Sequence, residues 1–173
     1  MKLRLADQAA AEAVAKLYVD GWRRTYRGLV PESYLNGLNV LDATERWIDF
    51  LQEPGAFLCV AEEDGRLIGF AAGRNSGEPG WEGELYALYQ EEGRRGTGLG
   101  KALFTCAVET FFVRGQRSML VWAMEANKQA VGFYRHMGGV LVRRRANCFG
   151  DTTVTDIAFG WPVLSDAINS SSV

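Results

Sequence analysis

One stretch decides how this chain folds: residues 84–103, which read ELYALYQ, then EEGRRGTG, then LGKAL. The first part is rich in residues typical of strands, and it belongs to a predicted strand over residues 82–89. The second part is polar and rich in glycine, as loops are. The third part begins a helix with Leu99, Leu103 and Ala107 on one face. The sequence therefore predicts a strand, a loop and a helix in direct succession.

The loop has the composition of a phosphate site. Its glycines, within Gly96–Gly100, permit positive φ and let the backbone approach a ligand closely. The first N–H groups of the next helix are unpaired and carry a partial positive charge. Arg94, Arg95 and Lys101 add full charges. These features predict a site for phosphate or pyrophosphate. The alternative is a glycine-rich turn that holds no ligand.

Two common nucleotide motifs do not fit this loop. A Walker A motif that ends at Gly100-Lys101 would need glycine at Arg95 and a hydroxyl at Ala102. A dinucleotide motif would need a glycine at Lys101 or Leu103. The spacing present is R-G-x-G-x-G.

Hydrophobic periodicity outside this stretch predicts a domain in which strands and helices mix. Asp7 and Asp42 are the expected N-caps of two helices, and Asp64-Gly65 is a hairpin signal. We expect a central mixed sheet flanked by helices. Strands are predicted over residues 2–5, 57–61, 67–72, 82–89, 118–123, 140–146 and 153–161, and helices over 7–26, 32–38, 42–51, 99–114 and 127–137. Residues 1–163 form one predicted domain, and 164–173, with Ser170–Ser172, are predicted to be a disordered tail.

Composition narrows the class of protein. The chain has 173 residues, 47% hydrophobic and 23% charged, as in globular domains. A net charge of -2 disfavours a nucleic-acid binder. There is no apolar run long enough for a membrane span and no apolar signal region at the N-terminus. Cys59, Cys106 and Cys148 lack metal-ligand spacing and are interpreted as reduced, buried thiols in a cytoplasmic protein.

A second cluster follows the next predicted strand. Residues 127–134 read NKQAVGFY, and Gly138 comes shortly afterwards. With the first stretch, this cluster resembles the GCN5-related N-acetyltransferase (GNAT) superfamily. That family has the signature [QR]-x-x-G-x-[GA], here Arg95–Gly100, and N-x-x-A-x-x-F-Y, here Asn127–Tyr134. The chain departs from the family at Gln90-Glu91-Glu92, where many members have V-x-P.

The resemblance implies a fold, a reaction and a cosubstrate. The fold is α/β, with a mixed, mostly antiparallel, twisted sheet of about seven strands between helices. The reaction transfers an acetyl group from acetyl-CoA to a primary amine by direct attack in a ternary complex, without a metal. The alternative is a domain of the same fold that binds acyl-CoA, or regulates, without catalysis.

The resemblance also implies two catalytic residues. Tyr134 would be the acid that protonates the CoA thiolate, since a tyrosine hydroxyl is protonated at neutral pH. Glu84 would be the general base, directly or through water, and on a strand it is expected to share a face with Tyr86 and Leu88. The bland alternatives are a core aromatic at Tyr134 and, at Glu84, a solvated carboxylate or one that only recognises a cation.

The binding residues follow from the same resemblance. Asn127 would bind the pantetheine arm, or serve only as a helix N-cap. Aromatic residues such as Trp22 and Tyr26 are most often core, but the family's first helices wall the acceptor pocket. The implied acceptor-binding residues are Trp22, Tyr26 and Tyr86, and the implied cofactor-binding residues are Leu88, Tyr89, Gln90, Arg94, Arg95, Gly96, Thr97, Gly98, Leu99, Gly100, Lys101, Asn127 and Tyr134.

The expected partners are few. They are acetyl-CoA and an amine acceptor, which is either a small molecule or a protein, with neither nucleic acid nor membrane. Homodimers are common in the family, although no sequence feature marks an interface. The early segment Gly21–Pro31 is similar to one found in small bacterial members.

Overall fold

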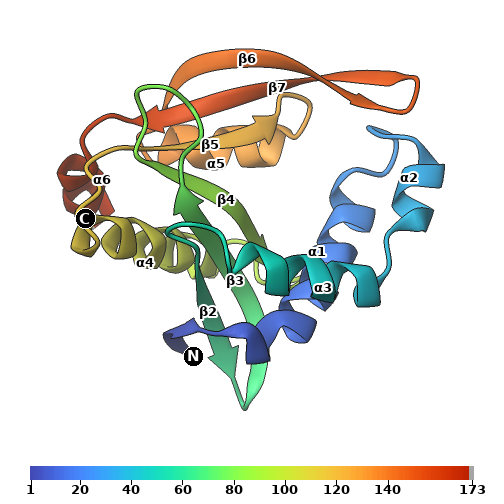
Figure 1. Ribbon diagram of the computed structural model, residues 1–173, viewed down its shortest axis with the longest axis horizontal. Coiled ribbons are helices and arrows are strands. Elements are labelled where there is room, and N and C mark those ends of the chain that lie inside the picture. The colour runs from blue at the N-terminus through green and yellow to red at the C-terminus, as the bar shows by residue number, and fades with distance from the viewer. Residues whose placement is uncertain (172–173) are drawn as a thin grey trace.

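The computed structural model describes residues 1–171, with side chains through residue 167, and its centre is one twisted sheet (Figure 1). The seven strands lie in the order β1-β2-β3-β4-β5-β7-β6. All neighbours are antiparallel except β4 and β5. The predicted mixed, mostly antiparallel sheet is therefore confirmed. The strands are β1 Lys2–Ala6, β2 Phe57–Glu63, β3 Arg66–Asn75, β4 Gly83–Gln90, β5 Met119–Met124, β6 Val140–Phe149 and β7 Thr152–Trp161.

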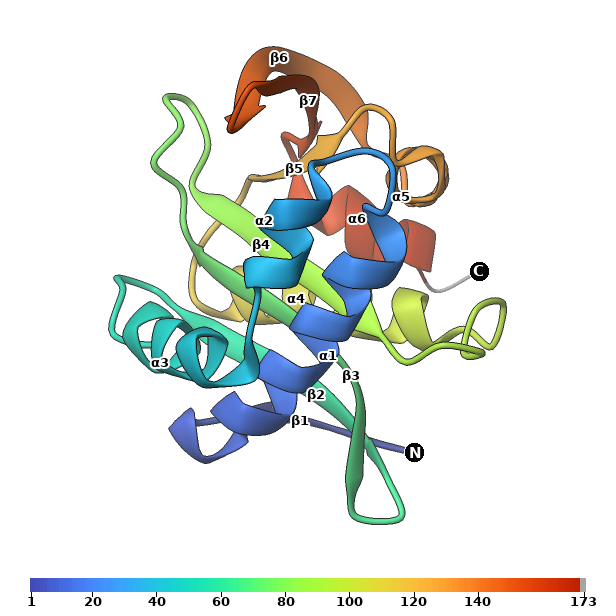
Figure 2. The same cartoon turned by 90° about the vertical axis from the view of Figure 1, so that its right-hand side faces the viewer.

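Helices cover both faces of the sheet (Figure 2). The helices α1 and α3 bury Val14 and Trp47 against one face, in a core that includes Phe70. The helices α4 and α5 bury Leu103 and Val131 against the other face. The helical elements are a short 3₁₀ helix Gln8–Ala10, α1 Ala11–Thr25, α2 Glu32–Gly37, α3 Val40–Phe50, α4 Leu99–Val113, α5 Lys128–His136 and α6 Leu164–Ser171.

Of the two predicted N-caps, Asp7 caps a helix and Asp42 does not. Asp7 is a cap, but of the 3₁₀ helix that precedes α1, since its carboxylate accepts from the Ala9 N–H at 2.9 Å. Asp42 is not a cap, because α3 begins earlier, at Val40. Asn39 caps α3 by accepting from the Asp42 N–H at 2.9 Å, while its amide donates to the Asp42 carboxylate at 2.6 Å.

The parallel pair β4 and β5 is joined at one end only. Its register consists of Gly83 opposite Met119 and Glu84 opposite Leu120. Beyond Glu84 the two strands diverge, and in the described sheet β4 continues to pair with β3 alone. One backbone edge of β4 therefore faces a cleft inside the molecule.

A β-bulge corrects the predicted face of β4. Ala87 pairs with Ala72 and Leu85 pairs with Gly73, so Tyr86 is an extra residue between them. Such an insertion resets the alternation of side chains. Tyr86 accordingly packs on the α3 side, stacked on Phe50 at 4.9 Å between ring centroids. Arg74 contacts both Glu84 and Tyr86, so these two share a side as expected. Leu88 packs against the α4-side core instead, so the expectation of one face is wrong for Leu88.

The predicted tail at 164–173 is also wrong over most of its length. Residues 164–171 form α6, and Leu164 and Ala167 are buried in the α4-side core. The Leu164 N–H donates to the Arg117 carbonyl at 2.9 Å and so ties the helix to the segment before β5. The prediction rested on the serine-rich composition and overlooked Leu164 and Ala167, two apolar residues one helical turn apart. Residues 172 and 173 lie outside the described part of the chain.

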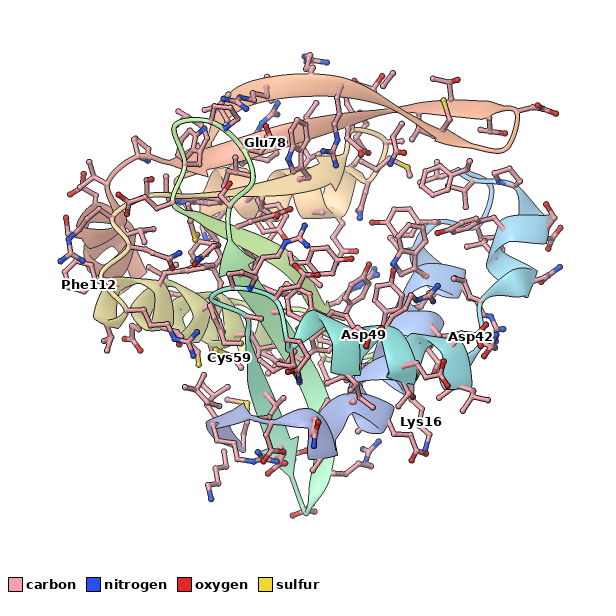
Figure 3. All side chains as sticks on the ribbon, in the orientation of Figure 1. Lys16, Asp42, Asp49, Cys59, Glu78 and Phe112 are labelled. Carbon is pink, nitrogen blue, oxygen red and sulfur yellow. The ribbon has the colours of Figure 1, made fainter. Side chains whose placement is uncertain are left out.

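The cysteines are only partly as expected. Cys59 is buried between β2 and α4, with its sulfur 3.7 Å from the Thr110 hydroxyl (Figure 3). A hydrogen bond with the Cys106 thiol, together with burial, raises the pKa of Cys59. Cys106 is half-buried, but Cys148 is exposed, so it is not a core residue. It lies on β6, an edge strand whose side chains are mostly in solvent.

Candidate active site

The cleft between β4 and β5 contains a cavity of about 410 Å³. Helix α1 walls it on one side, and α5 and the β6–β7 hairpin wall it on the others. The cavity joins segments from both halves of the chain. Its lining includes the predicted residues Trp22, Tyr26, Glu84, Tyr86, Leu88, Tyr89, Gln90, Arg95, Gly100, Asn127 and Tyr134.

The glycine-rich loop meets the cavity at the start of α4. Gly96 and Gly98 have φ of 75° and 85°, in the left-handed region that favours glycine. A Cβ at either position would meet no atom within 4 Å, so conformation rather than space requires glycine there. Gly98 is the residue before α4, and its carbonyl accepts the Ala102 N–H at 2.9 Å. The unpaired N–H groups of the first turn are therefore available to an anion.

The structure separates the three predicted cations of the loop. Arg95 is exposed and lines the cavity. Arg94 is turned to the hairpin between β2 and β3, where it is ion-paired with Glu63, and its Nε lies 3.9 Å from Glu91. Lys101 lines a different hollow, beside Arg4. Only Arg95 is thus placed at the mouth of the main cavity.

The end of β4 supplies an unusual polar atom. The Gln90 Oε1 is buried and has no hydrogen-bond partner among the described residues. A buried acceptor without a partner is costly, and such atoms are rare unless a ligand satisfies them. Asn127 faces the same cavity, and it is a helix cap as well, since its Oδ1 accepts from the Ala130 N–H at 3.1 Å.

Three tyrosines, Tyr18, Tyr26 and Tyr89, lie together at the end of β4. The Tyr89 ring lies 5.5 Å from Tyr18 and 5.7 Å from Phe70, centroid to centroid. A Cβ at Gly21 on α1 would overlap the Tyr89 ring, so glycine is required where helix and ring meet. Burial raises the pKa of Tyr26, although hydrogen bonds with Asn127 and Tyr89 partly oppose this.

Tyr134 is buried on α5 and lines the cavity. Its ring packs at 6.2 Å from Phe159 and 6.2 Å from Trp161. Burial raises its pKa above the ordinary value of 10. The hydroxyl is therefore protonated at neutral pH, as a proton donor must be.

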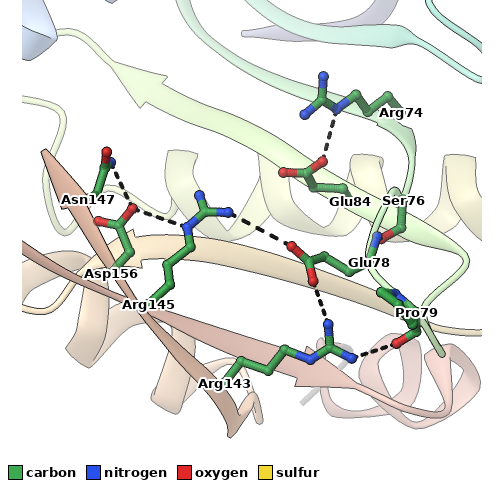
Figure 4. Close-up of polar contacts among 9 residues, drawn as sticks. All are labelled: Arg74, Ser76, Glu78, Pro79, Glu84, Arg143, Arg145, Asn147 and Asp156. Atoms are coloured by element: carbon green, nitrogen blue, oxygen red, sulfur yellow. Dashed lines mark hydrogen bonds and ion pairs between the residues drawn. The ribbon is translucent and has the colours of Figure 1, made fainter.

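Glu84 lies at the other end of β4, and its side chain is only 13% exposed. Its Oε2 accepts from Arg74 Nε at 2.9 Å (Figure 4), and Arg74 also binds Glu53 at 2.7 Å. The same guanidinium lies over the Tyr86 ring at 4.6 Å. Glu84 therefore faces the cavity as one partner of an ion pair rather than as a free carboxylate.

Sequence reasoning missed a polar group on the β6–β7 hairpin. Asp156 lines the cavity and is only 7% exposed. Its Oδ2 accepts from Asn147 Nδ2 at 3.0 Å and lies 3.5 Å from Arg145 Nε (Figure 4). One signal was available, because Asp156 alternates with Ala158 and Gly160 on a strand whose second half reads as buried. A carboxylate on that face is exceptional.

The loop between β3 and β4 closes this side of the site. Glu78 at its tip is ion-paired with Arg143 on β6 and lies 3.8 Å from Arg145 (Figures 3 and 4). Trp81 packs against Gly160, where a Cβ would overlap its ring. Arg143 and Arg145 on the edge strand β6 thus both hold this loop.

Comparisons with known proteins agree with this architecture. The sequence model described as the acetyltransferase (GNAT) family matches residues 12–138. The chain is 34% identical over 154 residues to YuaI, an uncharacterized N-acetyltransferase of Bacillus subtilis, covering 88% of this chain and 87% of that one.

Two solved structures have the same fold. A ribosomal-protein-alanine N-acetyltransferase from Brucella melitensis superimposes with a TM-score of 0.74 at 19% identity, over 93% of this chain and 99% of that one. The acetyltransferase yncA from Salmonella typhimurium, solved with acetyl-CoA, gives a TM-score of 0.72 at 18% identity, over 93% and 92%. Within residues 1–171, none of the helices is both long and apolar enough to cross a membrane. By the extent of the family match and the identity to YuaI, this chain belongs to the acetyltransferase (GNAT) family.

Proposed function

We propose that this protein transfers an acetyl group from acetyl-CoA to a primary amine. One observation carries the proposal: a single cavity joins the anion-binding start of α4, the open edge of β4 and the buried hydroxyl of Tyr134. The acetyl-CoA complex of the related Salmonella protein supports the choice of cosubstrate.

The residues of the cavity fit the parts of acetyl-CoA. Arg95 and the N–H groups that follow Gly98 would hold the pyrophosphate. The free backbone edge at Leu88–Gln90 would pair with the amides of the pantetheine arm. The buried Gln90 Oε1 would then accept the hydrogen bond that the protein itself does not provide.

Tyr134 would serve as the acid. When bound, acetyl-CoA supplies a thioester whose carbonyl carbon bonds to the amine nitrogen while the carbon–sulfur bond breaks. Tyr134 gives its proton to the departing thiolate and later regains one from solvent. The acceptor ammonium loses two protons in forming the neutral amide, so one proton is released overall. The Tyr134 hydroxyl suits this role because burial keeps it protonated.

Glu84 would take protons from the acceptor, directly or through water. Its place in the cavity supports this role. Arg74 holds Oε2 and so fixes the carboxylate, leaving Oε1 to face the acceptor. Exchange of Glu84 for glutamine would keep the hydrogen bond to Arg74 but remove the base.

The test is release of CoA thiol by purified protein with acetyl-CoA and a panel of amines. We expect Tyr134→Phe to lower kcat by about a hundredfold or more, with little change in the KM for acetyl-CoA. Tyr18→Phe is the matched control, since Tyr18 is a half-buried tyrosine of the same cavity wall. Equal losses in both variants would contradict the assignment. Binding of acetyl-CoA without turnover of any amine would instead favour a domain that binds acyl-CoA without catalysis.

A further inference from the structure

We propose that Asp156 binds the ammonium group of a small primary amine, in the part of the cavity that Phe149 closes. This proposal rests on the proposed acetyl transfer and names the class of acceptor. We call this part the acceptor half, and it is lined by Trp22, Tyr26, Trp122, Asn147, Phe149 and Asp156.

The first step of the argument is the burial of Asp156. Among the described residues it is the one charged side chain in the buried class. Burial of a carboxylate is costly unless a cation or hydrogen bonds compensate. Both contacts of this carboxylate, from Asn147 and Arg145, reach Oδ2. Among the side chains described, through residue 167, no donor reaches Oδ1, although the residue lines the cavity, so a cationic ligand would complete its pairing.

Arg145 leaves room for such a ligand. Its guanidinium lies 3.9 Å above the Trp122 ring and 3.8 Å from Glu78, so Asp156 shares it with two other partners. Its side chain is 48% exposed, which screens its charge more than the charge of the buried carboxylate. Asp156 therefore keeps an attraction for a second cation.

The second step is the position of Asp156 relative to the reaction centre. Asp156 pairs with Met124 across β7 and β5. The Met124 carbonyl accepts the Asn127 N–H at 2.9 Å, and Asn127 lies at the cofactor end of the cavity. An ammonium on Asp156 would thus lie beside the segment that is expected to hold the pantetheine arm.

The third step is the chemistry of the wall. The indole Nε1 atoms of Trp22 and Trp122 are buried and have no hydrogen-bond partner among the described residues, and both side chains line the cavity. Donors left unpaired at a ligand site favour a ligand with an acceptor group. The faces of the surrounding rings also favour a cation. We therefore infer an acceptor with a primary ammonium, an apolar body and a nearby hydroxyl or carbonyl.

The fourth step is the closure of the site. Phe149, at the end of β6, packs at 4.9 Å against Tyr34 on α2 and at 6.0 Å against Trp22 on α1. This contact joins the hairpin to the first helices over the acceptor half. An extended peptide would have to break it in order to reach Asp156, whereas a small amine is enclosed by it.

The test uses tryptophan fluorescence and needs no turnover. The probe is 2-amino-1-phenylethanol, and its uncharged match is 1-phenylethane-1,2-diol, each titrated into the full chain with and without CoA. We expect the amine to cause a saturable change in the fluorescence of Trp22 and Trp122. The diol should bind at least about tenfold more weakly, the loss typical of one charged hydrogen bond. This wild-type comparison depends on no variant that must fold. Equal binding of amine and diol, or binding of neither, would overturn the proposal.

Variants sharpen the test. Asp156→Asn should weaken binding of the amine about tenfold or more, and Asp156→Glu should restore part of it. In the thiol assay, Asp156→Asn should raise the KM for the amine and leave that for acetyl-CoA within about twofold. Unchanged amine binding, or faster acetylation of a peptide with a free N-terminus than of the small amine, would contradict the proposal. Amine binding that depends on Asp156, without thiol release, would refute the acetyl transfer alone.

Discussion

The two ends of the cavity are built in different ways. The end expected to hold the cofactor comes mainly from one continuous stretch, β4 with the loop and the start of α4, to which α5 adds Asn127 and Tyr134, and much of its chemistry is backbone. The acceptor half comes from α1, β5, β6 and β7, and its chemistry is side chain: a carboxylate, an amide and aromatic rings. Backbone that recognises a fixed ligand can be marked by a short motif, because glycine positions and strand ends are local. A pocket assembled from distant strands has no such motif.

The largest expected effect comes from Gly160→Ala, which should disturb the acceptor half of the cavity more than the end that is expected to hold acetyl-CoA. The added methyl would overlap the Trp81 ring and push the β3–β4 loop from β7. We expect the free energy of unfolding to fall by about 1–3 kcal/mol, as for other overpacked sites, measured by urea denaturation. In the thiol assay, the KM for the amine should rise more than that for acetyl-CoA.

The control for this variant is Gly132→Ala on α5, where a Cβ would meet no atom within 4 Å. Because alanine favours helix, this change should stabilise the protein by up to about 1 kcal/mol. Equal losses of affinity for amine and acetyl-CoA in Gly160→Ala would mean that the two ends are not independent.

The next prediction compares acetyl-CoA binding after substitution of two arginines in the glycine-rich loop, Arg95, which lines the cavity, and Arg94, which is paired elsewhere. Arg95→Ala should weaken binding of acetyl-CoA about tenfold by calorimetry, since a charge-assisted hydrogen bond to phosphate is lost, and less so at high salt. Arg94→Ala should have a smaller effect, because Arg94 is already paired with Glu63. A larger loss from Arg94 than from Arg95 would reverse this assignment.

The smallest expected effect is that of alkaline pH on kcat and on the stability that Tyr134 contributes, both of which should stay constant up to about pH 10. Burial raises the pKa of Tyr134 above its ordinary value of 10. The stability that comes from burying the neutral phenol is therefore complete below pH 10 and is lost only above it. We expect kcat to show no alkaline decline between neutral pH and about pH 10. A decline centred well below pH 10 that disappears in Tyr134→Phe would contradict the raised pKa.

Much of the fold could be predicted from the sequence. Periodicity and apolar runs placed the seven strands and five of the helices, because most of these segments have apolar residues in a regular pattern or an unbroken run, with turn residues at the ends. It failed at α6, where three apolar residues, Leu164, Ala167 and Ile168, among polar ones gave too short a pattern. It also failed at Leu88, beyond the bulge at Tyr86, because a bulge is a property of the pairing of two strands and not of one strand alone.

The parts of the site that could be predicted are those formed by residues close together in the sequence. Gly96–Gly100, Gln90 and Tyr134 lie in or beside motifs, and the structure brings Gln90, Gly100 and Tyr134 to one cavity. Arg94 is paired with Glu63 on another hairpin, a contact that no local motif reveals. Phe149 was missed because its ring neighbours Trp22 and Tyr34 lie more than a hundred residues away in the chain. Asp156 was missed because its partners Asn147 and Arg145 lie on the neighbouring strand β6, and the pairing of two strands is not read from one strand alone.

The divergence of β4 from β5 has a consequence for the behaviour of many copies together. A strand edge with unpaired N–H and C=O groups is ordinarily a template on which another molecule can add a strand, which begins aggregation. Here the open edge lies inside a cleft walled by α1 and α5, where a small ligand fits but a second sheet does not. The unpaired N–H and C=O groups of this edge are therefore accessible to a small ligand but not to a strand of another copy of the chain.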